Sequence, residues 1–245
     1  YVVTPRLAGV IKQVSPLWDG LEATKAIYFQ DGRPKQAGDT IRNPELAKLL
    51  RAVAKKGPSA FYKGQNARAI AAAVSNAPKN AAPMTLKDIA SYQAKDRDAV
   101  CTTYRVYKLC GMGPPSSGAT TVFQVLGMLE RFDMKALGKD DPKAWHLIAE
   151  AMLLAYADRE KYLGDADFVS VPVAGLIDKG YIASRSALIS ETTSLPSYAA
   201  GTPPGAEPRT AALSSEVAGT THFVAADRFG GVATMTSTVE GPFGS

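Results

Sequence analysis

The residues best suited to chemistry gather at the end of the chain, in "AGTTHFVAADRFGGVATMTSTVEGPFGS", residues 218–245. A threonine hydroxyl is a weak nucleophile unless a base lies beside it, and a free N-terminal amine on the same residue can be that base. Such an amine titrates near neutral pH, and a cut just before Thr220 would create it. Gly219 suits this cut, because a glycine leaves the scissile carbonyl open to attack and tolerates a strained backbone.

Other residues offer competing interpretations. Adjacent threonines in a strand commonly reflect β propensity alone. Ser116 and Ser117 are rival nucleophiles, but "GPPSSG" lacks the nucleophile-elbow pattern, and capping of the next helix explains both. His222 is interpreted either as a general base or as a structural residue of an alternating strand. His146 lies on a predicted helix beside Trp145, where a packing role is expected.

The composition is that of an ordinary globular protein. Hydrophobic residues make up 46% and charged residues 21% of 245, which suffices for one large domain or two small ones. The net charge of +5 comes from scattered Lys and Arg, so we expect no nucleic-acid partner. No apolar stretch is long enough to cross a bilayer. The start, "YVVTPRLAGV", has neither signal-peptide regions nor an initiator Met, so we expect the natural N-terminus, and any signal, to lie upstream.

Two cysteines, Cys101 and Cys110, flank "TTYRVYKL". Two Cys and two His at these spacings match no zinc signature, so no metal is expected. If the segment is a β-hairpin, the cysteines could face each other, and a disulfide would suit an exported protein. Two buried free thiols are the alternative, and the sequence leaves both open.

Helical patterns dominate the first hundred residues. Thr4, Asn43 and the pair Thr85 and Asp88 stand at capping positions before apolar runs of helical period. Two further helices follow the "GPPSSG" loop, and the longer one is "KAWHLIAEAMLLAYADREKYLGD". Its predicted apolar positions are Trp145, Ile148, Met152 and Ala155, and local ion pairs are expected among Asp158, Arg159 and Glu160.

Strand patterns occur twice. "AVCTTYRVYKLCGM" carries β-branched and aromatic residues at strand spacing and predicts a hairpin. Residues 193–215 are rich in Ser, Thr, Pro, Ala and Gly and predict a long exposed connection. Two further strands, "TTHFVAAD" and "GVATMTSTV", are joined by "RFGG". The order of elements predicts a layered α+β or αββα protein.

Several motifs in chain order resemble the gamma-glutamyltranspeptidase (glutathione hydrolase) family. They are "DGRPKQAGDTIRNPELAKLLRAVAKKGPSAFYKG", "MGPPSSGATTVFQVLGMLERFD", "AEAMLLAYADREKYLGDADFVSVPV", "GTTHF", "DRFGG" and "TSTVEGPFGS". The last three resemble the family's autoprocessing junction. The resemblance runs over nearly the whole chain, and agreement of separate motifs in order is far more specific than any one of them.

The resemblance implies an α+β fold, part of the αββα sandwich of N-terminal-nucleophile hydrolases, in a zymogen that cleaves itself between Gly219 and Thr220. Residues 1–219, with a flexible loop over 193–215, would be the later part of the large subunit, and residues 220–245 the start of the small one. Thr220 would attack γ-glutamyl amides such as glutathione, and water or an amino acid would accept the acyl group. Thr238 matches the threonine that contacts the nucleophile's new amine, and no cofactor is implied.

Position 240 departs from the family pattern, because the well-studied transpeptidases usually carry Asn where this chain has Glu240. A carboxylate would hold the α-ammonium of a glutamyl substrate more strongly than an amide. The glutamate at position 240 could equally reflect a different acyl group in the substrate, so a cephalosporin (glutaryl) acylase is the alternative enzyme. A non-catalytic relative that acts as a binding module is the alternative from another class of protein.

The resemblance also implies functional groups beyond this chain. They are an arginine that clamps the substrate α-carboxylate, a pair of serines and the glycine amides of the oxyanion hole. We therefore expect these 245 residues alone to be inactive. Members of the family are commonly periplasmic, secreted or tethered outside the cell, and we expect a periplasmic or secreted location.

Overall fold

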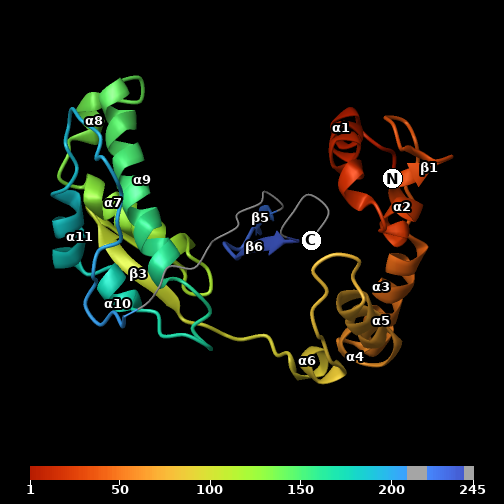
Figure 1. The fold of residues 1–245 in the computed structure, drawn as a ribbon. Coiled ribbons are helices and arrows are strands. Elements are labelled where there is room, and N and C mark those ends of the chain that lie inside the picture. Colours follow the sequence, from red (N-terminus) through yellow and green to blue (C-terminus); the bar gives the residue numbers. More distant parts are fainter. Residues whose placement is uncertain (209–219, 240–245) are drawn as a thin grey trace. The chain divides into compact units, whose positions relative to one another are not determined.

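The computed structural model describes residues 1–208 and 220–239 of the chain. The chain divides into two compact units, Tyr1–Ala94 and Lys95–Val217, with the C-terminal hairpin grouped with the first (Figure 1). Helices are mixed with strands, and the described strands form three two-stranded antiparallel sheets. This mixture confirms the α+β class predicted from the sequence.

Short amphipathic helices make up the first unit. Thr4 and Asn43 cap helices through their side chains, and Thr85 forms the predicted capping box with Asp88. A small apolar core surrounds the first helix and contains Val3, Ile11, Trp18 and Ile41. The elements are α1 Pro5–Val14, the 3-10 helix η1 Ser15–Trp18, α2 Glu22–Tyr28, β1 Phe29–Gln30, β2 Arg33–Pro34, α3 Pro44–Lys56, α4 Ser59–Tyr62, α5 Gly64–Ser75 and α6 Leu86–Ser91.

The second unit is built around one long helix, α9. Helices α7 and α11 pack beside it, and their shared core includes Met128, Leu129, Phe132, Leu147, Ala151, Leu154, Ala155, Ile182 and Ile189. The elements are β3 Ala99–Tyr104, β4 Tyr107–Met112, α7 Gly118–Leu129, α8 Met134–Leu137, α9 Pro142–Tyr162, α10 Val173–Leu176 and α11 Lys179–Ser186.

Strands β3 and β4 form the hairpin expected around "TTYRVYKL". Cys101 lies directly opposite Cys110 in its register, and the two are joined by a disulfide. Of the two alternatives left open by the sequence, the structure therefore has the bridged one.

The predicted apolar face of α9 is right at two positions and wrong at two. Ala155 is buried and Ile148 packs against the core, whereas Trp145 and Met152 are 61% and 44% exposed. The predicted local ion pairs are also absent for Asp158, because its carboxylate is buried and pairs with Arg185 of α11 at 3.4 Å. The buried face of α9 thus combines alanines and larger apolar residues with two carboxylates, Glu150 and Asp158.

After α11 the chain returns along α9 as a segment without helix or strand, residues 190–206, which we call the strap. It falls largely within the region predicted as an exposed connection. Leu195 and Tyr198 of the strap pack against the core, and its backbone is hydrogen-bonded to α9. The strap is therefore held closely against the second unit despite its composition.

Candidate active site

The predicted nucleophile lies at the first position of a strand. Strand β5, Thr220–Ala226, pairs antiparallel with β6, Val232–Thr238, and Thr220 is directly opposite Thr238. Directly opposed residues of an antiparallel pair have their Cβ atoms about 4.5–5.5 Å apart. The register thus brings together the two threonines that the sequence singled out.

A tight connection built on Asp227 sets this register. The Asp227 side chain accepts hydrogen bonds from the backbone N–H groups of Phe229 and Gly231, each at 2.8 Å. The Asp227 N–H donates to the Gly231 carbonyl at 2.9 Å. Gly230 has φ of +86°, a conformation that glycine adopts without steric cost. The "DRFGG" sequence therefore specifies a closed turn, as predicted.

One face of the hairpin is polar. Side chains alternate across a strand, so Thr220 and His222 share a face with the residues opposite them, Thr238 and Thr236. His222 Nδ1 lies 2.8 Å from Thr236 Oγ1, and its Nε2 lies 3.4 Å from Thr234 Oγ1. His222 is thus bonded across the strands to β6, which fits its interpretation as a structural residue of the strand.

This arrangement can support N-terminal nucleophile chemistry. An amine at Thr220 would have a hydroxyl on the opposite strand to orient it. Every residue of β5 and β6 is exposed, so within the described chain water reaches both faces of the hairpin. Gly219 and Glu240, the other two predicted site residues, lie outside the described residues.

The rival candidates have local structural roles. Ser116 accepts a hydrogen bond from the Gly118 N–H, and Ser117 Oγ accepts one from Arg159 Nε at 3.0 Å. Ser117 occupies the N-cap position of α7 without a side-chain capping bond, so the predicted capping is wrong for Ser117, whereas Ser116 satisfies the first N–H of the helix. His146 Nε2 lies 2.9 Å from the Ser190 carbonyl oxygen, which joins α9 to the start of the strap.

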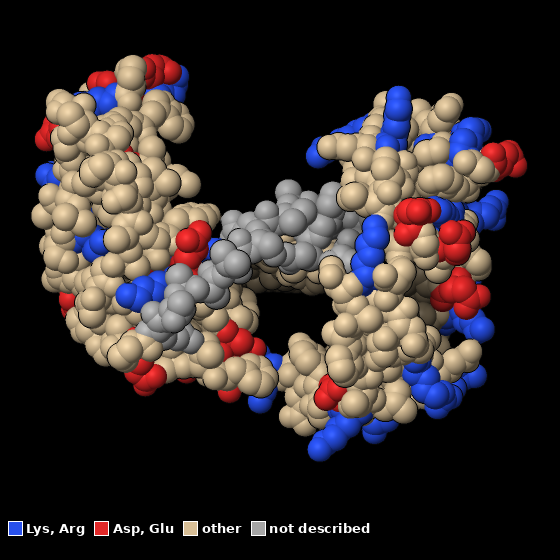
Figure 2. Space-filling view, viewed as in Figure 1, with Lys and Arg blue, Asp and Glu red and all other residues tan. Residues whose placement is uncertain are grey.

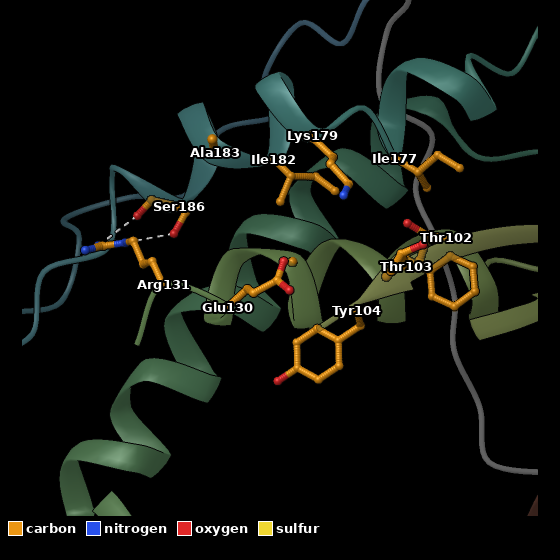
Figure 3. Close-up of a pocket in the computed structure, with 12 residues that line it drawn as sticks. Thr102, Thr103, Tyr104, Glu130, Arg131, Ile177, Lys179, Ile182, Ala183 and Ser186 are labelled. Atoms are coloured by element: carbon orange, nitrogen blue, oxygen red, sulfur yellow. Dashed lines mark hydrogen bonds between the residues drawn. The ribbon is translucent and has the colours of Figure 1, made fainter. Parts of the chain in front are cut away.

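A pocket of about 330 Å³ lies in the second unit, between β3, α7 and α11 (Figure 3). Apolar side chains of Phe123, Ile177 and Ile182 share its lining with Glu130 and Lys179. The two predicted site residues that the structure describes, Thr220 and Thr238, do not line it.

Charged side chains are spread over the described surface. Basic side chains are interspersed with acidic ones over the face in Figure 2, as the scattered sequence positions predict. Among the described residues, no group of three or more His, Cys, Asp or Glu could hold a metal ion. No helix of the described chain is long and apolar enough to cross a membrane.

Comparison with protein families gives a match over the whole chain. The model of the gamma-glutamyltranspeptidase family matches residues 1–245. A glutathione hydrolase proenzyme of Escherichia coli (strain K12) is 37% identical over 247 residues, covering 100% of this chain and 41% of the relative. An acylase ACY 1 proenzyme of Pseudomonas sp. (strain SE83) is 35% identical over 245 residues, covering 100% of this chain and 41% of the relative. The chain thus spans about two fifths of these relatives.

Solved structures agree with this match. The gamma-glutamyltranspeptidase of Helicobacter pylori superposes with a TM-score of 0.73 at 40% identity, covering 80% of this chain and 56% of that one. The structural relatives include gamma-glutamyltranspeptidases and a cephalosporin acylase, which confirms the predicted N-terminal-nucleophile hydrolase type of the fold.

Proposed function

Because this chain belongs to the gamma-glutamyltranspeptidase family, we propose that it acts in a self-processing threonine acyltransferase and hydrolase that cleaves γ-glutamyl amide bonds. The match over residues 1–245 carries the proposal, and the pairing of Thr220 with Thr238 supports it. Glutathione and its conjugates are the proposed substrates, with water or an amino acid as acceptor.

Self-cleavage makes the nucleophile. The Thr220 hydroxyl attacks the Gly219 carbonyl carbon, and the peptide bond is replaced by an ester to the threonine oxygen. Water then hydrolyses this ester, which leaves a carboxylate on Gly219 and a free amine on Thr220. The curated relatives are named proenzymes, in keeping with a precursor that is processed into two subunits.

The same hydroxyl then performs acyl transfer. The Thr220 amine accepts the hydroxyl proton as the oxygen attacks the γ-carbonyl carbon of the substrate. The leaving amine takes up that proton, and a γ-glutamyl ester of Thr220 remains. Water or the amine of an amino acid attacks this ester and regenerates the hydroxyl. In this scheme Thr238 orients the Thr220 amine, and Glu240 holds the substrate α-ammonium.

An acylase is the second candidate function. The relative named acylase ACY 1 proenzyme is 35% identical, close to the 37% of the glutathione hydrolase proenzyme. A γ-glutamyl and a glutaryl group differ by the α-amino group, so two anilides of these acids discriminate between the functions. Faster turnover of the glutaryl anilide by the full-length protein would favour the acylase.

The disulfide supports an exported protein. Disulfides persist in oxidising compartments such as the periplasm and the extracellular space, and are rare in the cytosol. The bridge between Cys101 and Cys110 therefore supports a periplasmic or secreted location.

The decisive test is the intact mass of the full-length protein after purification and incubation, compared with its Thr220→Ala variant. We expect the unmodified protein to separate into two chains at the bond between Gly219 and Thr220, and the variant to stay whole. Cleavage at another bond, or equal cleavage of the variant, would remove Thr220 from its proposed role.

A further inference from the structure

Two facing helix surfaces form most of the pocket in the second unit (Figure 3). Residues three or four positions apart lie on one face of a helix, and the lining residues follow this spacing. They include Lys179, Ile182 and Ser186 of α11, and Phe123, Gly127 and Glu130 of α7 and its C-cap. A Cβ at Gly127 would lie 2.8 Å from a methyl group of Ile182, so the glycine lets the two helices approach closely.

The remaining side of the pocket is the edge of β3. Thr102, Thr103 and Tyr104 are consecutive, and all three line the pocket. Successive side chains of a strand point to opposite faces, so three consecutive lining residues indicate that the backbone edge borders the pocket. Among the described strands β3 pairs only with β4, and no residue of β4 lines the pocket. This edge therefore offers backbone N–H and C=O groups that the hairpin does not use.

Two side chains of opposite charge meet in the pocket without pairing. Glu130 Oε1 accepts the Arg105 N–H at 2.7 Å, which orients the carboxylate and leaves Oε2 without a hydrogen bond to any described residue. Lys179 has neither a hydrogen bond nor an ion pair within the described chain. In Figure 3 the two charged groups extend into the same space from opposite sides. Both are consequently available to a ligand.

The third charged side chain of the lining, Arg131, is already used by the fold. Its Nε donates to Ser186 Oγ at 2.9 Å, and its Nη2 donates to the carbonyl oxygens of Ser186 and Ile189 at 3.1 and 2.7 Å. Its guanidinium also lies over the Phe132 ring. Arg131 therefore joins α7 to the end of α11, and Glu130 and Lys179 are the charged lining residues left for recognition.

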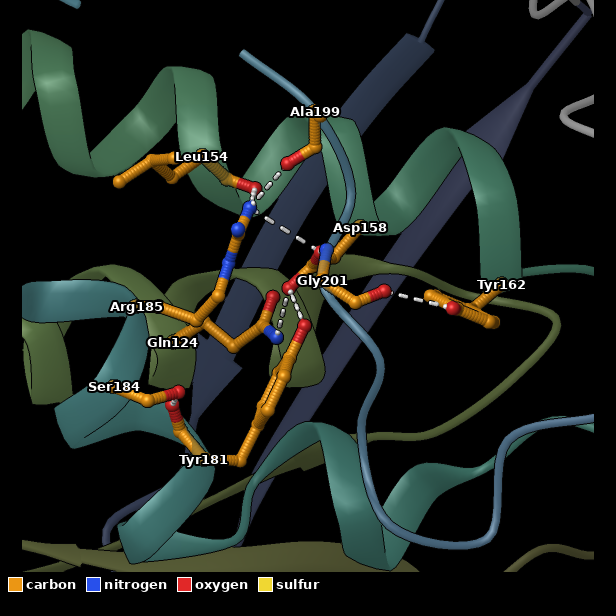
Figure 4. Close-up of polar contacts among 9 residues, drawn as sticks. All are labelled: Gln124, Leu154, Asp158, Tyr162, Tyr181, Ser184, Arg185, Ala199 and Gly201. Atoms are coloured by element: carbon orange, nitrogen blue, oxygen red, sulfur yellow. Dashed lines mark hydrogen bonds and ion pairs between the residues drawn. The ribbon is translucent and has the colours of Figure 1, made fainter. Parts of the chain in front are cut away.

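Helix α11 is held in its orientation by its other face, which is bonded to α9 (Figure 4). The Tyr181 hydroxyl donates to Asp158 Oδ2 at 2.7 Å, and Arg185 Nη2 lies 3.4 Å from Asp158 Oδ1. Burial and the contact with Asp158 raise the pKa of Tyr181, so its hydroxyl keeps the proton that it donates. Breaking these contacts would leave a buried carboxylate short of partners, which is costly. The pocket is therefore pre-formed, as ligand pockets usually are.

The lining matches the chemistry of a short peptide. Phe123, Ile177 and Ile182 offer an apolar surface for a side chain. The edge of β3 can bond a peptide amide, as strand edges do in peptide recognition. A ligand with one charge would leave Glu130 or Lys179 desolvated and unpaired, whereas the two ends of a peptide satisfy both. The volume of about 330 Å³ lies near the lower end of the range for ligand pockets and suits a dipeptide.

We propose that this pocket binds a dipeptide with apolar side chains, whose ammonium pairs with Glu130 and whose carboxylate pairs with Lys179. The proposal goes beyond the proposed function and does not depend on it, because Thr220 and Thr238 do not line this pocket.

The probe is leucyl-leucine, and isothermal titration calorimetry of the full-length protein measures its Kd. N-acetyl-leucyl-leucine lacks the ammonium, and leucyl-leucine amide lacks the carboxylate. Glu130→Gln removes the charge but keeps an acceptor for the Arg105 N–H, and Lys179→Met removes the ammonium but keeps an apolar chain. Glu160→Gln and Lys135→Met are the matched controls, since both residues are exposed and neither lines the pocket.

We expect each pocket variant to weaken leucyl-leucine binding about threefold to tenfold, between the effects of an exposed ion pair and of a buried charged hydrogen bond. The matched controls should bind like the unmodified protein. The acetylated peptide should not distinguish Glu130→Gln from the unmodified protein, because it has no ammonium to lose a partner. The amide should likewise not distinguish Lys179→Met. General damage to the pocket would not produce this pairing of ligand and variant.

Several results would overturn the proposal. They are no binding of leucyl-leucine at millimolar concentration, binding that neither pocket variant weakens, and equal weakening of all three ligands in each variant. Lys179 has no hydrogen bond or ion pair within the described chain, so Lys179→Met with the amide decides the question if Glu130→Gln does not fold. The Thr220→Ala variant should bind leucyl-leucine with unchanged Kd whether or not the protein cleaves itself. Loss of binding in that variant would place the peptide at Thr220 and contradict the proposal.

Discussion

Thr220 faces Thr238 because the register of β5 and β6 is fixed. A slip by one residue would place Ser237 or Val239 opposite Thr220, and would turn every side chain of one strand to the other face. His222 opposes such a slip through its contact with Thr236. At the residue scale, the contacts of the histidine across the strands therefore help to keep the two hydroxyls together.

Glu240 gives the sharpest test of substrate choice at this scale. In Glu240→Gln of the full-length protein, we expect kcat/KM for a γ-glutamyl anilide to fall about tenfold to a hundredfold. A hydrogen bond to a charged group contributes about 1.5–3 kcal/mol, and the amide would replace a charged partner of the α-ammonium. The glutaryl anilide has no α-ammonium, so its kcat/KM should stay unchanged.

Glu160→Gln is the matched control for this prediction, since Glu160 is exposed on α9. Equal losses for both anilides in Glu240→Gln would contradict contact with the α-ammonium. They would point to a general role of position 240 in the site.

At the element scale, the β3–β4 hairpin depends on its disulfide. In the double variant Cys101→Ser, Cys110→Ser, we expect the free energy of unfolding to fall by about 2.5 kcal/mol, the entropy of closing a loop of about ten residues. Urea unfolding with and without a reductant measures this effect. The double variant should be insensitive to the reductant. A full complement of free thiols in the unreduced, denatured protein would contradict the bridge.

The sequence predicted where helices begin better than it predicted which helix faces are buried. Caps at Thr4, Asn43 and Thr85 are local hydrogen bonds between residues three apart, and all three were found. The face of α9 was misplaced at Trp145 and Met152, which are large and apolar yet exposed, whereas the buried side carries Leu147 and Leu154 and accepts Asp158. Which side is buried depends on these distant partners.

At the scale of the whole molecule, the strap shows the same limit of prediction from local sequence. Its Ser, Pro, Ala and Gly content is typical of an exposed connection, and residues 190–206 contain no helix or strand. Its contacts with Glu150 and Asp158 span more than forty residues of sequence, so no local pattern reveals them. The proximity of Thr238 to Thr220, by contrast, was implied by the family resemblance, and the short turn and the strand register bring the two residues together.

Exposure of the hairpin leads to a prediction for the chain as a whole. We expect the purified chain of 245 residues to show no turnover of a γ-glutamyl anilide, with the full-length protein as positive control. Every residue of β5 and β6 is exposed, so water competes for any charge that develops beside Thr220. Loss of a single oxyanion donor costs about 10²–10³ in kcat, which shows how strongly such chemistry depends on a site closed to water. The expectation would be contradicted if the chain released aniline and its Thr220→Ala variant did not. The hairpin would then be sufficient for catalysis while open to solvent.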